Sequence, residues 1–150
     1  MEGISLISKF EGRTFHIAKG EYRTIISGKD TKGKYAVIEM NVPSGAGPLP
    51  HAHPDTEETF YVASGEVDFR TENGIFKAKT GDIIRIPFGG AVHSFKNTSD
   101  RAVTLICTVH PAGFDVMFEE MNASDPSKTR EIGEKFGNKF FNEDYLDQNI

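Results

Sequence analysis

Turn-forming residues recur at short intervals between positions 20 and 100, and they leave room only for short segments of regular structure. The clearest turn is Asn73-Gly74, because both residues tolerate the positive φ of a two-residue hairpin. It joins the alternating segment 66–71 to the segment 75–79. Further β-rich segments lie at 22–27, 35–42, 83–86 and 102–109. Short strands separated by turns at this spacing predict a sandwich or a barrel.

The pattern changes after Pro111, where apolar residues take up helical spacing. An amphipathic helix of about two turns is predicted from Phe114, Met117, Phe118 and Met121. A second helix is predicted to start at Asp125-Pro126, with Asp125 as N-cap, and to end near Gly137. We therefore expect a β-barrel domain over 1–111. A helical extension over 112–150 would pack on the barrel or on a partner subunit.

Two histidines, His51 and His53, stand two positions apart at the end of a loop rich in glycine and proline. Residues i and i+2 of a strand point to the same side, about 6–7 Å apart at Cα, so the two imidazoles can converge on one ion. The strand that follows contains two adjacent carboxylates. Placing Glu58 inside buries Phe60 and Val62 with it, whereas Glu57 inside would bury a more polar set. Glu58 is therefore the better candidate ligand.

A third histidine, His93, opens a further β-rich segment and shares a face with Phe95 and Asn97. Imidazole and carboxylate groups together are typical of transition-metal ligation. The sequence therefore predicts one divalent transition metal, bound by His51, His53, Glu58 and His93.

The spacing of these residues resembles that of a known family. The pattern Gly45-x5-His51-x-His53-x4-Glu58-x6-Gly65 resembles the first motif of the cupin superfamily. Gly81-x5-Pro87-x-Gly89, followed by His93-x3-Asn97, resembles the second, with three residues instead of two between Gly89 and His93. The resemblance implies an all-β fold, a jelly-roll barrel (double-stranded β-helix), with a short C-terminal helical extension. It also implies that His51, His53, Glu58 and His93 bind Fe, Mn, Ni, Cu, Co or Zn.

The segment after Pro111 is similar to that of single-domain cupins described as quercetin-dioxygenase-like. This similarity favours a metal-dependent dioxygenase that acts on a small aromatic or enol-containing substrate, with Glu58 serving as ligand and as catalytic base. One alternative is a non-oxidative isomerase, decarboxylase or hydrolase that uses the same metal. Another is a cupin that binds a small molecule without turnover.

Charge and hydrophobicity indicate which partners and which cellular location to expect. The formal net charge is −5 and the basic residues are scattered, which disfavours nucleic acid. No apolar run approaches the ~18 residues of a membrane span, and the N-terminus lacks the apolar core of a signal peptide. The single cysteine, Cys107, is predicted in the core. We expect a cytoplasmic protein without membrane contact. A homodimer is also expected, since single-barrel cupins commonly dimerise and leave a strand edge exposed.

Overall fold

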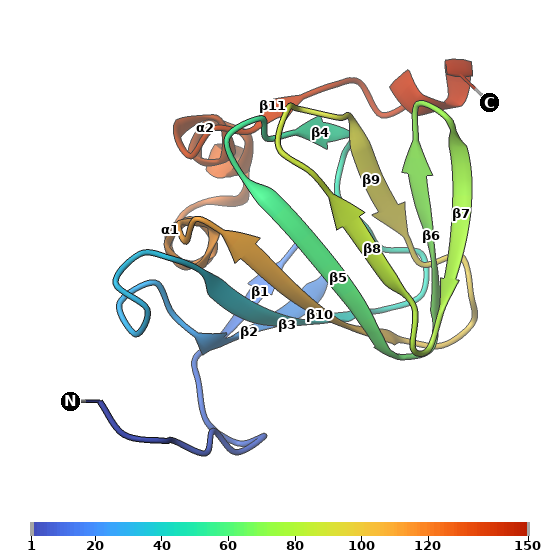
Figure 1. Cartoon of the computed structure of the whole chain (residues 1–150). Coiled ribbons are helices and arrows are strands. Elements are labelled where there is room, and N and C mark those ends of the chain that lie inside the picture. The colour runs from blue at the N-terminus through green and yellow to red at the C-terminus, as the bar shows by residue number, and fades with distance from the viewer. Residues whose placement is uncertain (1, 150) are drawn as a thin grey trace.

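The strands form two facing antiparallel sheets with the core between them (Figure 1). The computed structural model describes residues 2–149. The first sheet has six strands, in the order β1 (Thr14–Ile17), β2 (Gly20–Ile26), β3 (Ala36–Val42), β10 (Val103–His110), β5 (Glu57–Ser64) and β8 (Ile83–Ile86). The second has five, in the order β11 (Lys139–Phe140), β4 (His51–Ala52), β9 (His93–Lys96), β6 (Glu66–Thr71) and β7 (Gly74–Lys79). This two-sheet arrangement confirms the predicted cupin-type jelly roll.

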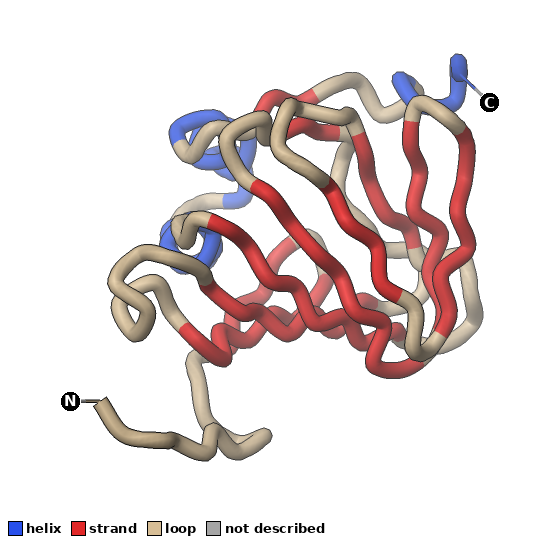
Figure 2. The backbone as a smooth tube through the Cα atoms, in the orientation of Figure 1, coloured by secondary structure: helices blue, strands red, loops and turns tan. Residues whose placement is uncertain are grey.

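Two short α-helices follow β10 in the chain. In Figure 2 the helical segments are blue and lie beside the strands. α1 (Phe114–Ala123) has ten residues, longer than the two turns predicted, and it packs against β1 and β3. The Asp125 side chain accepts a hydrogen bond from the Ser127 amide, but it caps a 3-10 helix (Pro126–Lys128) that leads into α2 (Thr129–Lys135). A second 3-10 helix (Tyr145–Asn149) follows β11. Among residues 2–149, no helix is long and apolar enough to cross a membrane.

The β6–β7 hairpin corrects one sequence expectation. Thr71 pairs with Gly74, so the loop consists of Glu72 and Asn73. Only Gly74 of this turn has a positive φ, at 120°. The Thr71 hydroxyl explains the shift, because it accepts a hydrogen bond from the Asn73 amide at 3.1 Å and donates one to the Gly74 carbonyl at 2.9 Å. The threonine side chain thus closes the turn one residue earlier than the Asn-Gly pair predicts.

Three phenylalanines join the two sheets inside the barrel. Phe60 lies on β5 of the first sheet, whereas Phe69 and Phe95 lie on β6 and β9 of the second. Their ring centroids are 5.1 to 5.7 Å apart, and each side chain is buried. Aromatic rings at these distances and tilts pack favourably beyond the area that they bury. The cluster therefore fills part of the space between the two sheets.

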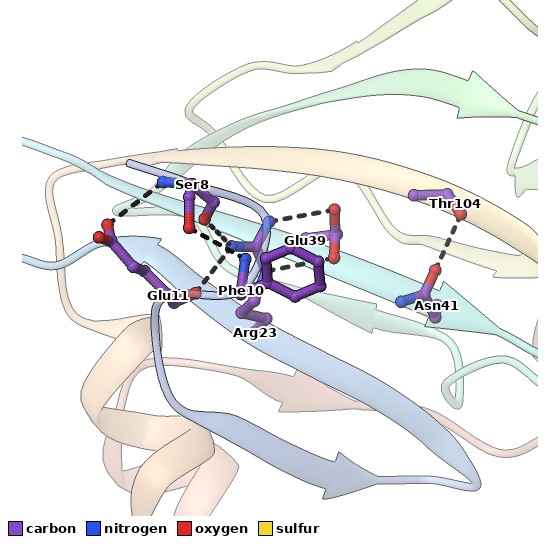
Figure 3. A network of polar contacts seen from close by, with 7 residues as sticks. All are labelled: Ser8, Phe10, Glu11, Arg23, Glu39, Asn41 and Thr104. Carbon is purple, nitrogen blue, oxygen red and sulfur yellow. Dashed lines mark hydrogen bonds and ion pairs between the residues drawn. The ribbon is translucent and has the colours of Figure 1, made fainter. Parts of the chain in front are cut away.

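The segment before β1 is held on the outer face of the first sheet by Arg23 (Figure 3). Its guanidinium donates hydrogen bonds to the carbonyls of Ser8 and Glu11, at 3.2 and 2.8 Å, and pairs with the Glu39 carboxylate at 3.3 Å. On the same face, the Thr104 hydroxyl donates to the Asn41 side chain at 2.8 Å. These polar contacts lie outside the barrel, so they leave its interior to the apolar core and the histidines.

Candidate metal centre

The three histidines predicted as ligands come together at one end of the barrel. His51 on β4 lies directly opposite His93 on β9, and His53 follows β4. The ring centroids are 4.5 to 5.7 Å apart, and one potential ligand atom from each ring lies within 4.8 Å of the other two. His53 and His93 are buried, while His51 is half-buried. The strand pairing therefore brings together imidazoles that are some forty residues apart in the sequence.

Backbone carbonyls fix the tautomer of all three rings. In each ring, Nδ1 lies at hydrogen-bond distance from a carbonyl oxygen of a nearby residue. These oxygens belong to Leu49, Thr56 and Ala91, at 2.7, 2.9 and 2.8 Å respectively. A carbonyl oxygen can only accept, so Nδ1 carries the proton and Nε2 keeps its lone pair. Metal-binding histidines are commonly held in this way, with one nitrogen donating to the protein and the other free for the ion.

Two of these Nε2 atoms lack partners. Among residues 2–149, Nε2 of His53 and Nε2 of His93 are buried and have no hydrogen-bond partner. A buried polar atom without a partner is costly, so a native site usually supplies one. Three neutral imidazoles with converging lone pairs are a donor set that suits Fe, Ni, Cu or Zn. The cluster of His51, His53 and His93 is therefore consistent with a metal site.

Glu58 lies beside this cluster, on the inner face of β5. Its Oε1 is 3.7 Å from Nε2 of His53 and 4.0 Å from Nε2 of His93. The side chain is buried together with Phe60 and Val62, as the strand alternation predicts. Glu57 faces outward and forms an ion pair with Arg85. The carboxylate inside the barrel is thus placed to reach an ion held by the histidines or a molecule bound next to it.

The charges of these groups depend on one another. Burial, with the nearby His93, lowers the pKa of His51 to about 3. Burial also lowers the pKa of His93. Burial acts in the same direction on His53, but the Glu58 carboxylate outweighs it and raises the pKa of His53. Burial would raise the pKa of Glu58, yet the histidines, His53 foremost, lower it. At neutral pH the site therefore holds one carboxylate and at least two neutral imidazoles.

These pKa shifts predict how protons compete with a metal ion for the histidine nitrogens. We expect the affinity for a divalent transition metal to fall as the pH is lowered through the raised pKa of His53, by about tenfold per pH unit for each proton displaced. His53 protonates first because its pKa is raised, whereas His51 competes only in strong acid. Isothermal titration calorimetry in buffers of different ionisation heat counts the protons released. Constant affinity with no proton release would contradict this expectation.

The turn before His93 carries the extra residue noted in the second motif. Gly89 and Gly90 both adopt positive φ, at 116° and 83°, which glycine tolerates and most residues do not. The turn absorbs the additional residue before β9 begins, and His93 still lies opposite His51. Asn97, the last residue of the motif, is buried, and its side-chain amide donates to the Val42 and Arg101 carbonyls. Its role is to hold loops together, away from the histidines.

A cavity of about 480 Å³ opens beside the histidines. His51 and Glu58 line it, together with Phe60 and Phe95 of the barrel interior. Aromatic and methionine side chains from β2, β3, α1 and β11 also line it, namely Tyr22, Met40, Phe114, Met117, Phe118, Met121 and Phe140. Charged side chains line it as well, namely Arg70, Lys96, Arg130 and Glu143. Helical spacing alone predicts a packing surface for α1, so its part in this wall was missed. Tyr22 stands outside any motif, and no sequence signal singles it out.

Three other residues do not belong to the histidine cluster. Cys107 is buried in the core in phase with Val103 and Val109, as predicted, and its pKa is raised by burial and by Glu58. A thiol of this kind stays protonated and unreactive. His16 and His110 are exposed. His110 packs its ring 5.8 Å from that of Tyr35, so the structure gives neither histidine a place in the site.

Comparison with known families agrees with this geometry. Residues 38–109 match the Cupin_2 family, described as the cupin domain. This match contains the three histidines and Glu58. The fold is thus that of a cupin, and the segment that holds the candidate site matches a cupin domain.

Individual relatives are distant. Over 100 residues the chain is 25% identical to quercetin 2,3-dioxygenase of Bacillus subtilis, a match that covers 67% of this chain and 29% of that enzyme. Over 78 residues it is 31% identical to an uncharacterized protein of Methanocaldococcus jannaschii, covering 52% of this chain and 62% of that protein. The matches thus span less than two thirds of either relative.

Solved structures share the fold at lower identity. A predicted oxalate decarboxylase from Thermotoga maritima superposes with a TM-score of 0.66 at 20% identity, covering 71% of this chain and 99% of that one. The polyketide cyclase RemF from Streptomyces resistomycificus superposes with a TM-score of 0.64 at 16% identity, covering 72% and 80%. At this identity the likeness establishes the fold alone.

Proposed function

We propose that this cupin is a metal-dependent dioxygenase that acts on a small aromatic or enol-containing molecule. The observation that carries the proposal is the cavity of about 480 Å³, in which His51 and the buried Glu58 adjoin walls of aromatic and methionine side chains. Such walls favour a flat apolar body, and His51 and Glu58 offer polar groups beside it. The distant similarity to quercetin 2,3-dioxygenase, over 67% of the chain, supports the same reading.

The ligands in this proposal are His51, His53 and His93, with Glu58 as the fourth. A bound divalent transition metal supplies Lewis acidity toward a substrate oxygen and, if redox-active, a route for electrons to dioxygen. The protein's own part is to hold three imidazoles in the tautomer that leaves Nε2 free. This pre-set arrangement needs little rearrangement on binding.

Glu58 acts as the base in the proposed reaction. Its lowered pKa keeps the carboxylate ionised at neutral pH, and it lies on the cavity wall beside two of the histidines. The carboxylate can therefore accept the proton of a substrate hydroxyl held against the cluster.

The test is oxygen uptake by the metal-loaded protein. Protein reconstituted separately with Fe, Mn, Ni, Cu, Co or Zn is mixed with a panel of flavonols, catechols and cyclic diketones in an oxygen electrode. We expect dioxygen and substrate to be consumed one for one with at least one redox-active metal, and none with Zn. Loss of substrate without dioxygen would point to an isomerase, decarboxylase or hydrolase. Binding without loss would point to a cupin that only binds.

A further inference from the structure

Tyr22 is a polar residue in an otherwise apolar part of the cavity wall. It lies on β2, opposite Phe15 of β1 and Met40 of β3, and its side chain is 5% exposed. Its ring meets that of Phe118 edge to face, with centroids 5.0 Å apart and an interplanar angle of 88°. Both rings line the cavity that Glu58 also lines. Two sheet neighbours and one helix residue therefore hold the tyrosine in place.

None of the hydrogen bonds found among residues 2–149 involves the Tyr22 hydroxyl, and its oxygen is not one of the fully enclosed side-chain atoms that lack a partner. Tyr22 lines the cavity, so its hydroxyl is open to a molecule that enters there. Tyrosine hydroxyls in largely buried positions usually find a hydrogen-bond partner. Phenylalanine would pack against Phe118 equally well, so the hydroxyl group is the feature that a bound molecule can use.

The surroundings keep this hydroxyl protonated. Burial raises the pKa of Tyr22 well above its usual range, and the nearby Cys107 and Glu58 raise it further. A tyrosine that stays neutral is a hydrogen-bond donor. Its natural acceptor in an apolar cavity is an oxygen that carries, or acquires, negative charge.

We infer that Tyr22 binds the substrate by donating its phenolic hydrogen to an enol or phenol oxygen of an aromatic molecule seated in the cavity. This inference rests on the proposed function and narrows its substrate class. The molecule must present a hydroxyl that ionises, next to an aromatic body that packs against Phe118 and the methionines. A hydrocarbon ring without that oxygen would fill the same space and leave Tyr22 unpaired.

The proton transfer balances without any further reagent. The O–H bond of the substrate breaks, its proton passes to a carboxylate oxygen of Glu58, and the electron pair stays on the substrate oxygen. Tyr22 gives up no proton. It donates a hydrogen bond that becomes stronger as the oxygen becomes negative.

The experiment compares two probes with two variants. The probes are 3-hydroxyflavone and flavone, which differ by one hydroxyl group. The proteins are wild type and Tyr22→Phe, each loaded with zinc, which is redox-inert and prevents turnover. Dissociation constants come from fluorescence titration, and the absorption spectrum of bound 3-hydroxyflavone reports whether its hydroxyl is ionised. Tyr35→Phe is the matched control, because it makes the same change at a residue that does not line the cavity.

We expect Tyr22→Phe to bind 3-hydroxyflavone about tenfold more weakly, with less of its ionised form, and to bind flavone unchanged within roughly twofold. Tyr35→Phe should match wild type with both probes. Equal effects of Tyr22→Phe on both probes, or no effect on either, would overturn the role of Tyr22 while leaving the proposed function standing. Wild-type protein that binds neither probe would overturn the aromatic-substrate proposal, and this inference with it.

Discussion

Replacing Glu58 with glutamine is expected to lower kcat for dioxygen uptake by about 10²–10⁴-fold, the range that a positioned base contributes. Glutamine matches glutamate in size but accepts no proton from a substrate hydroxyl. The site around it stays formed, because the three histidines are held by backbone carbonyls and not by Glu58. The comparison is made at saturating metal, with metal content measured in each sample, so that a weaker fourth ligand is not mistaken for a lost base.

The neighbouring residue supplies a matched control. Glu57→Gln makes the same chemical change one position earlier, on the outer face of β5, where the carboxylate pairs with Arg85. Surface ion pairs contribute little, so activity and stability should stay close to wild type. If Glu58→Gln kept full activity at full metal occupancy, Glu58 would not be the base, and the reaction would need another proton acceptor.

Phe69→Ala is expected to produce the largest loss of stability among the positions considered, about 3–5 kcal/mol in the free energy of unfolding. Phe69 is fully buried and contacts Phe60 and Phe95 from the opposite and the neighbouring strand. Removing its ring leaves a cavity between the sheets that the rigid strands cannot close. Thermal unfolding followed by circular dichroism should show a midpoint roughly 10 °C lower.

An exposed phenylalanine tests whether burial is the cause. Phe10 is 86% exposed in the segment before β1, so Phe10→Ala should change the midpoint little. A similar loss for both variants would show that the contribution of Phe69 does not come from its packing between the sheets.

Strand alternation and turn preferences predicted much of this fold, because both depend only on residues that are neighbours in the sequence. Alternation along β5 placed Glu58 inside and Glu57 outside, and the structure agrees. Turn residues marked the strand ends closely, although the Thr71 hydroxyl moved one turn by a residue. The resemblance to the cupin motifs then implied the jelly-roll barrel and the meeting of distant histidines, which alternation alone cannot give.

The cavity could not be predicted in the same way. Met117 and Met121 have the helical spacing of ordinary packing residues, and only the position of α1 beside the open end of the barrel makes them cavity walls. No sequence pattern distinguishes Tyr22 from other strand residues either. Its place on the cavity wall follows from the pairing of β2 with β3. Of the three phenylalanines between the sheets, Phe60 and Phe95 line the cavity, whereas Phe69 is buried in the core. Whether an apolar residue lines the cavity or is buried in the core depends on packing between distant segments. Patterns of neighbouring residues in one sequence do not reveal that packing.

Elemental analysis shows whether the three histidines bind one transition metal ion. Wild type, His53→Ala and His16→Ala are purified identically, without added metal or chelator, and their metal content is measured. His16 is exposed and far from the cluster in the sequence, so its variant controls for the loss of any histidine. We predict a near-stoichiometric transition metal in wild type and His16→Ala, and little in His53→Ala, which lacks one imidazole of the site. Wild type without metal even after reconstitution, or equal metal in all three proteins, would contradict the account.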